Sequence, residues 1–300
     1  MPVHVSALHV YPVKSLRGSA VDSVELERQG LRHDRRWMVV DEHGAALTAR
    51  TVPQMLSVTA RADVDGALEL STAGRRSLHV ALPHLGPSVP VTLSRVGTVI
   101  DAGAAAHTWL TSVLGRPARL VWLDDPARRS VAGVHGGREG DVLSLADAGP
   151  VVLASSASLR RLDRWIADGY AQRYARCGAA AGSRPPLIAM ERFRPNVVVE
   201  GDLEAFVEDG WRTVQIGPAR LRYAEQVDRC VLTTVDPGSL RRGTEPLRTL
   251  SKHRRRDGKV WFGIRLVPDS PSVLALGDLV HALPAAAHPS QPIVATSPAR

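Results

Sequence analysis

Cys230 is the residue of this chain whose sequence neighbours could make it reactive. Arg229 precedes it, a β-branched run follows at residues 231–235, and further arginines stand at positions 241, 242 and 248. Nearby guanidinium groups stabilise a thiolate, and a thiolate is a soft ligand for transition metals. The alternative is a buried cysteine that packs as a small apolar residue in a strand, which is the commoner role of a free cysteine. These residues alone leave both interpretations open.

Other short polar segments stand at the ends of predicted strands. They supply cations, hydroxyls and amides, and they comprise Lys14-Ser15, Asp34-Arg35, the serines at 155, 156 and 158, Arg194-Pro195-Asn196, and Arg229-Cys230 with Thr233, Thr234 and Asp236. This inventory fits a phosphorylated, metal-bearing cofactor whose metal accepts one protein thiolate. Two segments also have a plainer interpretation, because a serine before a helix is an ordinary N-cap and an aspartate in a turn ordinarily bonds backbone amides.

The common catalytic motifs are absent from the sequence. No GxGxxG, Walker A, HExxH or GxSxG pattern occurs, which argues against the usual dinucleotide, nucleotide-triphosphate, zinc-protease and serine-hydrolase sites. The eleven histidines are dispersed. Cys177 and Cys230 are the only cysteines, so the sequence excludes a disulfide framework and a four-thiolate iron–sulfur cluster.

The net charge of +8 is carried almost entirely by arginine, since only three of the 38 basic residues are lysines. Arginine suits bidentate contact with phosphate or carboxylate, whereas the aromatic residues that could stack on bases make up only 4% of the chain. We therefore expect an anionic small ligand and no nucleic acid. No apolar leader follows Met1 and no apolar run of about 18 residues occurs, so we expect a cytoplasmic protein without membrane contact.

Many short strand patterns separated by turn residues predict a mainly β chain, with spacing that favours antiparallel barrels or sandwiches. Helical periodicity marks residues 106–114 and a second run that carries Leu159, Leu162 and Ile166, which Gly169 is expected to end. The aperiodic stretch 127–140 suggests a boundary, so we predict domains at residues 1–126 and 127–284. The Ala-, Pro- and Ser-rich residues 285–300 are predicted to be a disordered tail.

The order of several motifs resembles that of MOSC proteins (molybdenum cofactor sulfurase C-terminal). YPVKSLRG at residues 11–18 and LRHDRRWMVVDEHGAALTAR at 31–50 resemble their N-terminal β-barrel domain. FRPNVVV at 193–199 and RCVLTTVDP at 229–237, followed by PLRTL, resemble the MOSC domain itself. The pair is similar to the amidoxime-reducing component group and its bacterial relatives. Leu16 stands where many relatives have cysteine, and GSLRRGTEP at 238–246 replaces a shorter turn.

The resemblance implies a mainly β (α+β) fold, in which an N-terminal β-barrel domain packs against a MOSC β-barrel domain with a few helices. It also implies that a molybdenum cofactor (Mo-molybdopterin) lies between the domains, with Cys230 as the metal ligand. Cys230 and Asp236 are the predicted catalytic residues, with Asp236 as a candidate proton donor. The predicted cofactor contacts are Lys14, Ser15, Arg35, Ser155, Ser156, Ser158, Arg194, Asn196, Arg229 and Thr233.

The implied activity is that of a molybdenum-dependent oxidoreductase. Such an enzyme reduces small N-hydroxylated compounds, while a separate donor protein of the ferredoxin or flavoprotein type returns two electrons. One alternative is a sulfur-carrier or cofactor-handling module in which Cys230 carries a persulfide. Another is a basic nucleic-acid-binding protein, whose affinity would fall steeply with salt.

Overall fold

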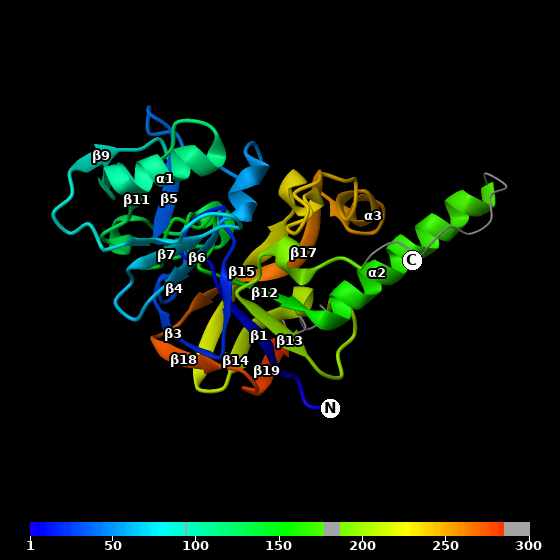
Figure 1. Cartoon of the computed structure of the whole chain (residues 1–300). Helices are drawn as coiled ribbons and strands as arrows, with labels where there is room; N and C mark the ends of the chain where they lie inside the picture. Colours follow the sequence, from blue (N-terminus) through cyan, green and yellow to red (C-terminus); the bar gives the residue numbers. More distant parts are fainter. Residues whose placement is uncertain (94, 177–186, 285–300) are drawn as a thin grey trace, which may run out of the picture.

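The computed structural model describes residues 1–93, 95–176 and 187–284, and it consists of two interlocked halves made mostly of strands (Figure 1). A nine-stranded sheet organises the second half, in the order β19-β14-β15-β17-β12-β13-β1-β2, with the short β16 paired to β17. Its strands are β1 (His4–Val10), β2 (Ser19–Val21), β12 (Val151–Ser155), β13 (Val197–Glu200), β14 (Trp211–Ile216), β15 (Ala219–Asp228), β16 (Arg255–Arg256), β17 (Lys259–Pro268) and β19 (Val280–Pro284).

Two smaller antiparallel sheets and one helix build the first half. The sheet orders are β5-β11-β10-β9 and β6-β7-β8. The helix α1 (Ala104–Leu114) buries Ala106, Leu110 and Leu114, which recur every four residues and therefore lie on one face. This helix confirms the periodicity at residues 106–114. The strands are β5 (Trp37–Val40), β6 (Thr59–Ala62), β7 (Leu68–Ser71), β8 (Leu78–Val80), β9 (Ser88–Pro90), β10 (Thr98–Asp101) and β11 (Arg119–Trp122).

The first strand of the chain, β1, belongs to the large sheet of the second half. β1 pairs antiparallel with β13, with His4 opposite Glu200. A third sheet also joins the halves, because β18 (Ser272–Ala275) pairs with β3 (Ser23–Glu27), which in turn pairs with β4 (Gly30–Leu31). The predicted division at residue 126 stays a prediction, and sheets shared by both parts run across it. The predicted tail at 285–300 lies outside the described residues.

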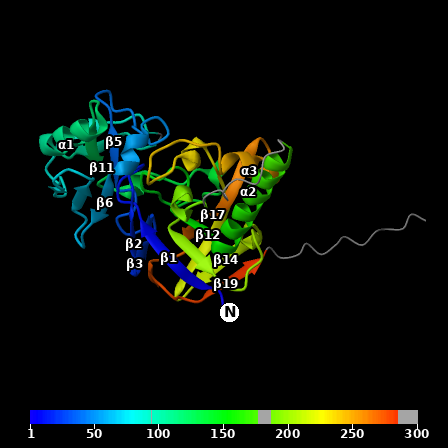
Figure 2. The ribbon, with the colours of Figure 1, turned by 45° about the vertical axis from the view of Figure 1, so that its right-hand side comes forward.

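Helices cover one side of the large sheet. α2 (Ser156–Arg176) and α3 (Leu247–His253) contact each other and pack on β12, β13 and β17, and Figure 2 shows both beside these strands. Leu162 and Ile166 of α2 are buried against Phe262 of β17 and Leu250 of α3. None of the helices in the described part of the chain is long and apolar enough to cross a membrane.

The predicted end of α2 at Gly169 is wrong, because the helix continues to Arg176. One glycine costs a helix only about 1 kcal/mol relative to alanine. The residues that follow are mostly good helix formers, and the Arg173 guanidinium lies over the Tyr170 ring, 4.4 Å from its centroid, one turn away. Local propensity and this contact outweigh the single glycine.

Candidate anion-binding cleft

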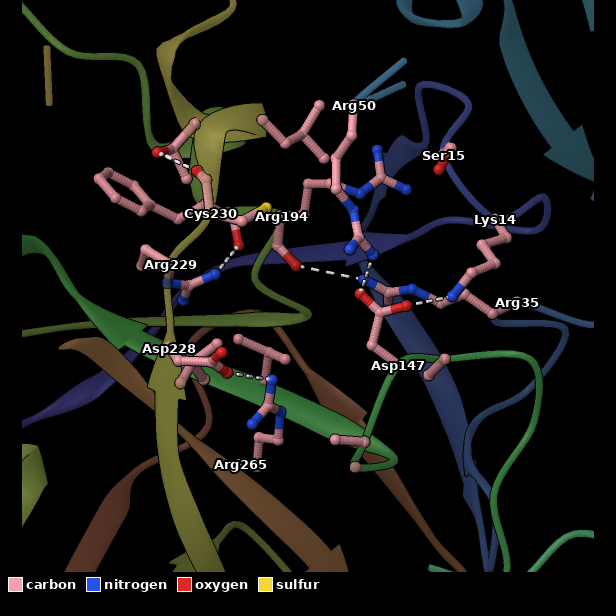
Figure 3. A pocket seen from close by; sticks show the side chains of 18 of the residues that line it. Lys14, Ser15, Arg35, Arg50, Asp147, Arg194, Asp228, Arg229, Cys230 and Arg265 are labelled. Atoms are coloured by element: carbon pink, nitrogen blue, oxygen red, sulfur yellow. Dashed lines mark hydrogen bonds and ion pairs between the residues drawn. The ribbon is translucent and has the colours of Figure 1, made fainter. Parts of the chain in front are cut away.

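A cleft lies between the two halves, where loops from both meet the ends of the large sheet (Figure 3). It encloses about 810 Å³, including space open to solvent. The first half supplies Lys14 and Ser15 from the segment after β1, Arg35 from the turn before β5, and Arg50. The second half supplies residues 146–149 before β12, 192–194 at the short 3₁₀ helix η4 (Met190–Phe193), 227–230 at the end of β15, Leu232, Thr233 and Arg265.

Positive charge dominates the lining of this cleft. Seven cationic side chains line the cleft together with two carboxylates, those of Asp147 and Asp228. Three of the cations also pair with carboxylates outside the lining, Arg35 with Asp34, Arg192 with Asp236 and Arg265 with Glu225, whereas Arg194 and Arg229 form no ion pair within the described residues. Guanidinium groups bind phosphate and carboxylate through paired charge-assisted hydrogen bonds. An anionic ligand would therefore both pair with these groups and relieve their mutual repulsion. The cations are Lys14, Arg35, Arg50, Arg192, Arg194, Arg229 and Arg265.

Cys230 lies exposed in this cleft, just beyond the last residue of β15. It precedes a 3₁₀ turn, η6 (Val231–Thr234), and its carbonyl accepts hydrogen bonds from Thr233 N at 3.2 Å and Thr233 Oγ1 at 3.0 Å. The interpretation of Cys230 as a buried strand residue is therefore wrong. Thr233 and Thr234 hydroxyls bond carbonyls three residues back, which favours a turn over a strand despite the β-branched composition.

The guanidinium of Arg229 is held by backbone carbonyls. Nε and Nη2 donate to the Phe262 carbonyl at 2.8 and 2.6 Å, and Nη1 donates to the Phe193 carbonyl at 2.8 Å. Burial and then the charge of Arg265 lower the pKa of Arg229 to about 9. Because carbonyls fix the orientation of this cation without neutralising it, its charge remains available to an anion in the cleft.

Arg194 and Arg35 both pack against the ring of Tyr11. Their guanidinium carbons lie 4.3 and 4.5 Å from the ring centroid, and Arg194 Nη1 donates to the Leu16 carbonyl at 2.7 Å. Burial and then the charge of Arg35 lower the pKa of Arg194 to about 10. The aromatic ring therefore helps to hold two cations close together, since each is attracted to its π-system.

Asn196 does not line the cleft, but its side chain is hydrogen-bonded to Arg35, which does. Its Oδ1 accepts from Arg35 Nη1 at 3.0 Å and from Val152 N at 3.1 Å, while its Nδ2 donates to Asp34 Oδ1 at 3.1 Å. Asp34 is buried and also forms an ion pair with Arg35. The predicted cofactor contact at Asn196 is thus placed as a structural link between the two halves.

Lys14 and Arg50 converge on Asp147 across the cleft, as Figure 3 shows. Lys14 Nζ donates to the Leu145 carbonyl at 3.0 Å and to the Asp147 carboxylate, and Arg50 Nη2 lies 3.3 Å from Asp147 Oδ2. Burial lowers the pKa of Lys14. Burial works against ionisation of Asp147, but Lys14 and then Arg50 hold its pKa well below its usual range. This wall is therefore an ordered ion-pair cluster.

Asp236 lies outside the lining of the cleft. Its carboxylate accepts from Ser239 N at 2.8 Å, Ser239 Oγ at 2.9 Å and Arg192 Nη2 at 2.7 Å. These bonds, first those from Ser239, lower the pKa of Asp236. An aspartate that accepts hydrogen bonds from the backbone and side chain of a residue in its own turn caps that turn. The geometry therefore gives no support to a proton-donor role at Asp236.

The serines at the start of α2 also lie outside the cleft. Ser155 Oγ accepts from Ser158 N at 3.1 Å, which is an N-cap bond. Ser155 and Ser158 hydroxyls further bond the buried carboxyl of Glu208, at 3.2 and 2.7 Å, and Ser158 Oγ accepts from Phe206 N. Ser156 begins the helix beside them. The hydroxyls of Ser155 and Ser158 therefore make their hydrogen bonds inside the protein.

The structure thus brings together seven of the predicted site residues and separates five from them. The cleft is lined by Lys14, Ser15, Arg35, Arg194, Arg229, Cys230 and Thr233. The residues outside its lining are Ser155, Ser156, Ser158, Asn196 and Asp236.

Five charged lining residues were missed by the sequence reasoning: Arg50, Asp147, Arg192, Asp228 and Arg265. Two of them carried a usable signal. Arg50 closes the motif at 31–50, and Asp147 stands just before the strand at residue 151, the same context that marked the other segments. Arg265 lies in the middle of β17 and shows no such signal.

The structure thus places an exposed thiol and several guanidinium groups in one cleft between two β halves. Comparison with family models gives the MOSC N-terminal beta barrel domain at residues 3–117 and the MOSC domain at residues 140–281. The chain belongs to the MOSC family, which confirms the resemblance and the mainly β class expected from the sequence.

Two curated relatives agree with this assignment. The mitochondrial amidoxime-reducing component 1 of Homo sapiens is 32% identical over 303 residues, which cover 93% of this chain and 82% of the relative. The molybdenum cofactor sulfurase of Oryza sativa subsp. japonica is 31% identical over 277 residues, which cover 88% of this chain and 32% of that protein. Among solved structures, the YUAD protein of Bacillus subtilis aligns over 93% of this chain and 94% of its own, with 11% identity and a TM-score of 0.37.

Proposed function

We propose that this chain binds a molybdenum cofactor in the cleft at Cys230 and there reduces small N-hydroxylated compounds, with electrons from a separate ferredoxin- or flavoprotein-type donor. Relatives named amidoxime-reducing component and molybdenum cofactor sulfurase support the choice of cofactor and reaction class. The observation that carries the proposal is an exposed thiol, Cys230, in a cleft that also contains two guanidinium groups, Arg194 and Arg229, with no ion-pair partner among the described residues.

The side chains of the cleft fit such a cofactor. Its phosphate is an anion, and Arg194 and Arg229 are half-buried cations whose hydrogen bonds go to carbonyls. Their lowered pKa values reflect a cost of burial that a bound anion would offset. The Cys230 thiolate would ligate the metal, while Lys14, Ser15 and Thr233 would offer polar contacts from the two walls.

When bound, the cofactor would supply a two-electron redox couple at its metal. The reaction balances when the N–O bond of the substrate breaks, two electrons and two protons are taken up, and water is released. The residues of the chain bind and orient the reactants, and Lys14 Nζ keeps Asp147 ionised and fixed. The cleft includes space open to solvent, which can supply both protons.

Metal and pterin content, measured together with activity, test the proposal. Protein made in a host that synthesises the cofactor should contain near-stoichiometric molybdenum and pterin, and should reduce benzamidoxime with an artificial electron donor. Cys230→Ala should lose the metal and the activity, whereas Cys177→Ala, at the chain's other cysteine, should keep both. Wild-type protein from such a host that lacks molybdenum and pterin would overturn the proposal.

The exposure of Cys230 also favours a second candidate function, that of a sulfur carrier. A persulfide needs a thiol that another protein can reach, and one relative is named a molybdenum cofactor sulfurase, of which this chain spans about a third. Mass spectrometry distinguishes the two candidates, because a carrier would show an added sulfur atom on Cys230 in protein that holds no molybdenum.

A further inference from the structure

A second pocket adjoins the cleft and shares one lining residue, Arg192, with it. It encloses about 960 Å³, including space open to solvent. One wall comes from α2 and Ile188, and the other from residues 236–245, which we call the arginine loop. The lining residues are Ile166, Tyr170, Ile188, Arg192, Thr234, Asp236, Ser239, Arg241, Arg242, Gly243, Thr244 and Glu245.

The two walls differ in chemistry. Ile166, Tyr170 and Ile188 form a largely apolar wall, in which the Tyr170 ring also packs against the guanidinium groups of Arg173 and Arg248. The arginine loop forms the polar wall opposite. A ligand with an apolar body and a polar end would place each part against a matching surface.

Two cations of the arginine loop lack a carboxylate partner. Arg192 pairs with Asp236 at 2.7 Å, and Glu245 pairs with Arg248 at 2.7 Å. These pairs use both carboxylates of the pocket. Arg241 and Arg242 are exposed, and within the described residues neither forms an ion pair. The pocket therefore carries two positive charges that an oxyanion, a carboxylate or a phosphate, could neutralise.

The arginine loop is held in place by its own hydrogen bonds. Leu240 N donates to the Asp236 carbonyl at 2.8 Å, Asp236 N to the Arg241 carbonyl at 2.9 Å, and Gly243 N to the Thr234 carbonyl at 2.9 Å. Arg242 Nη2 donates to the Arg50 carbonyl of the first half at 2.8 Å. The backbone of the loop and the Arg242 guanidinium are thus held in place, which lowers the entropy cost of binding at Arg242.

Arg192 connects this pocket to the thiol. Its side chain lines both spaces, and its Nη1 lies 3.5 Å from the carbonyl of Thr233, a lining residue of the cleft. Its Nε is buried and has no hydrogen-bond partner among the described residues. A ligand in the second pocket would have one end beside Arg192, whose side chain also lines the cleft that contains Cys230.

We propose that the second pocket is the substrate subsite and that it selects N-hydroxylated compounds with an apolar or aromatic body and an anionic substituent, which Arg241 and Arg242 bind. This inference rests on the proposed function, because it assigns a substrate class to the same reaction. The juxtaposition of an apolar wall, two unpaired guanidinium groups and the shared Arg192 carries it.

Binding to the cofactor-loaded protein tests the pocket without turnover. The probes are 4-carboxybenzamidine and its methyl ester, which lack the N–O bond, with a 4-phosphono analogue to compare the two oxyanions. Wild type should bind the carboxylate about tenfold more tightly than the ester. R241A/R242A should abolish this preference, and the matched control R255A/R256A, which removes the same charge from exposed residues outside both pockets, should keep it.

Steady-state kinetics provide a second readout. With 4-carboxybenzamidoxime, R241A/R242A should raise KM about tenfold and change kcat little, while KM for uncharged benzamidoxime stays the same. An unchanged preference in R241A/R242A, or an equal loss for acid and ester, would overturn the substrate subsite. Absence of molybdenum or of any benzamidoxime reduction in wild type would instead count against the proposed function, and the binding preference would still report on the pocket.

Discussion

β12 and β15 end on the same side of the large sheet, but the polar side chains at their ends differ in exposure. Both strands pair antiparallel with β17, and Leu153 and Gln226 stand opposite the same residue, Ile264, so the strands run in the same direction. Polar side chains follow at both ends: Ser155 with Ser158, and Arg229 with Cys230. At β12 they are buried against Glu208, whereas at β15 they face the cleft.

What the chain does next explains the difference. After β12 a helix begins at once, so the Ser155 hydroxyl is used as its N-cap and the neighbouring Glu208 takes the remaining hydroxyls. After β15 the chain turns through η6, where the Thr233 and Thr234 hydroxyls bond carbonyls three residues back and the Cys230 thiol stays exposed. Polar residues at a strand end are free for a ligand only when the local backbone does not consume them.

The largest effect should come from the exposed end. Cys230→Ser should lose most of the molybdenum, since a hydroxyl is a poorer ligand for this metal than a thiolate, and the variant should stay folded because the side chain is exposed. Elemental analysis with circular dichroism checks both parts. A folded variant with full metal content would remove the distinction between the two strand ends.

Arg229→Met should weaken cofactor retention roughly 10- to 100-fold, because it removes a half-buried cation that bonds two carbonyls beside the cleft. The molybdenum remaining after extended dialysis measures the effect. Arg222→Met, within β15, is the matched control, since Arg222 pairs with Asp141 and lines no part of the cleft. Equal retention in the two variants would contradict the anion-binding role of Arg229.

Ser155→Ala should lower the free energy of unfolding by about 1–3 kcal/mol, through loss of the helix cap and of a bond to a buried carboxyl. Molybdenum content should not change, because the serine lies outside the cleft. Urea unfolding and elemental analysis of the same preparation measure both quantities. Loss of metal at unchanged stability would show that the serine contacts the cofactor after all.

Glu208→Gln should have the smallest effect, a change in how the free energy of unfolding depends on pH. Burial raises the pKa of Glu208 above its ordinary value of 4.5, so the folded protein keeps a proton that the unfolded chain has released. The stability of wild type therefore falls as pH rises from this ordinary value through the raised one. The variant lacks this term, so its stability relative to wild type should increase from pH 4 to pH 8 in urea unfolding. A constant difference would contradict a raised pKa.

Much of the cleft was predictable because its residues sit in short motifs at strand ends, where side chains project toward loops. Cys230, Lys14, Arg35 and Arg194 were found in this way. Ser155 and Ser158 show the limit of that reasoning, because their partner Glu208 lies at least 50 residues further along the chain. No feature of the sequence near the serines indicates this contact. Arg265 was missed for the converse reason, since a strand interior gives no sign that it borders a ligand site.

The sheet topology was the least predictable part of the fold. Periodicity identifies the strands individually but not their partners, so a boundary near residue 127 was natural from composition. The pairing of β1 with β13 and of β3 with β18 depends on contacts between residues far apart in sequence. The choice of partner depends on packing across the whole sheet.

That topology also sets an order of events during synthesis. β1 pairs with β13, whose last residue is Glu200, so the N-terminal strand leaves the ribosome long before its partner exists. At roughly 5–20 residues per second, it waits on the order of 10–40 s with an unpaired edge. Chaperones that shield exposed strands, and the rate of translation through the first 200 residues, will therefore influence how much of this protein reaches the native state.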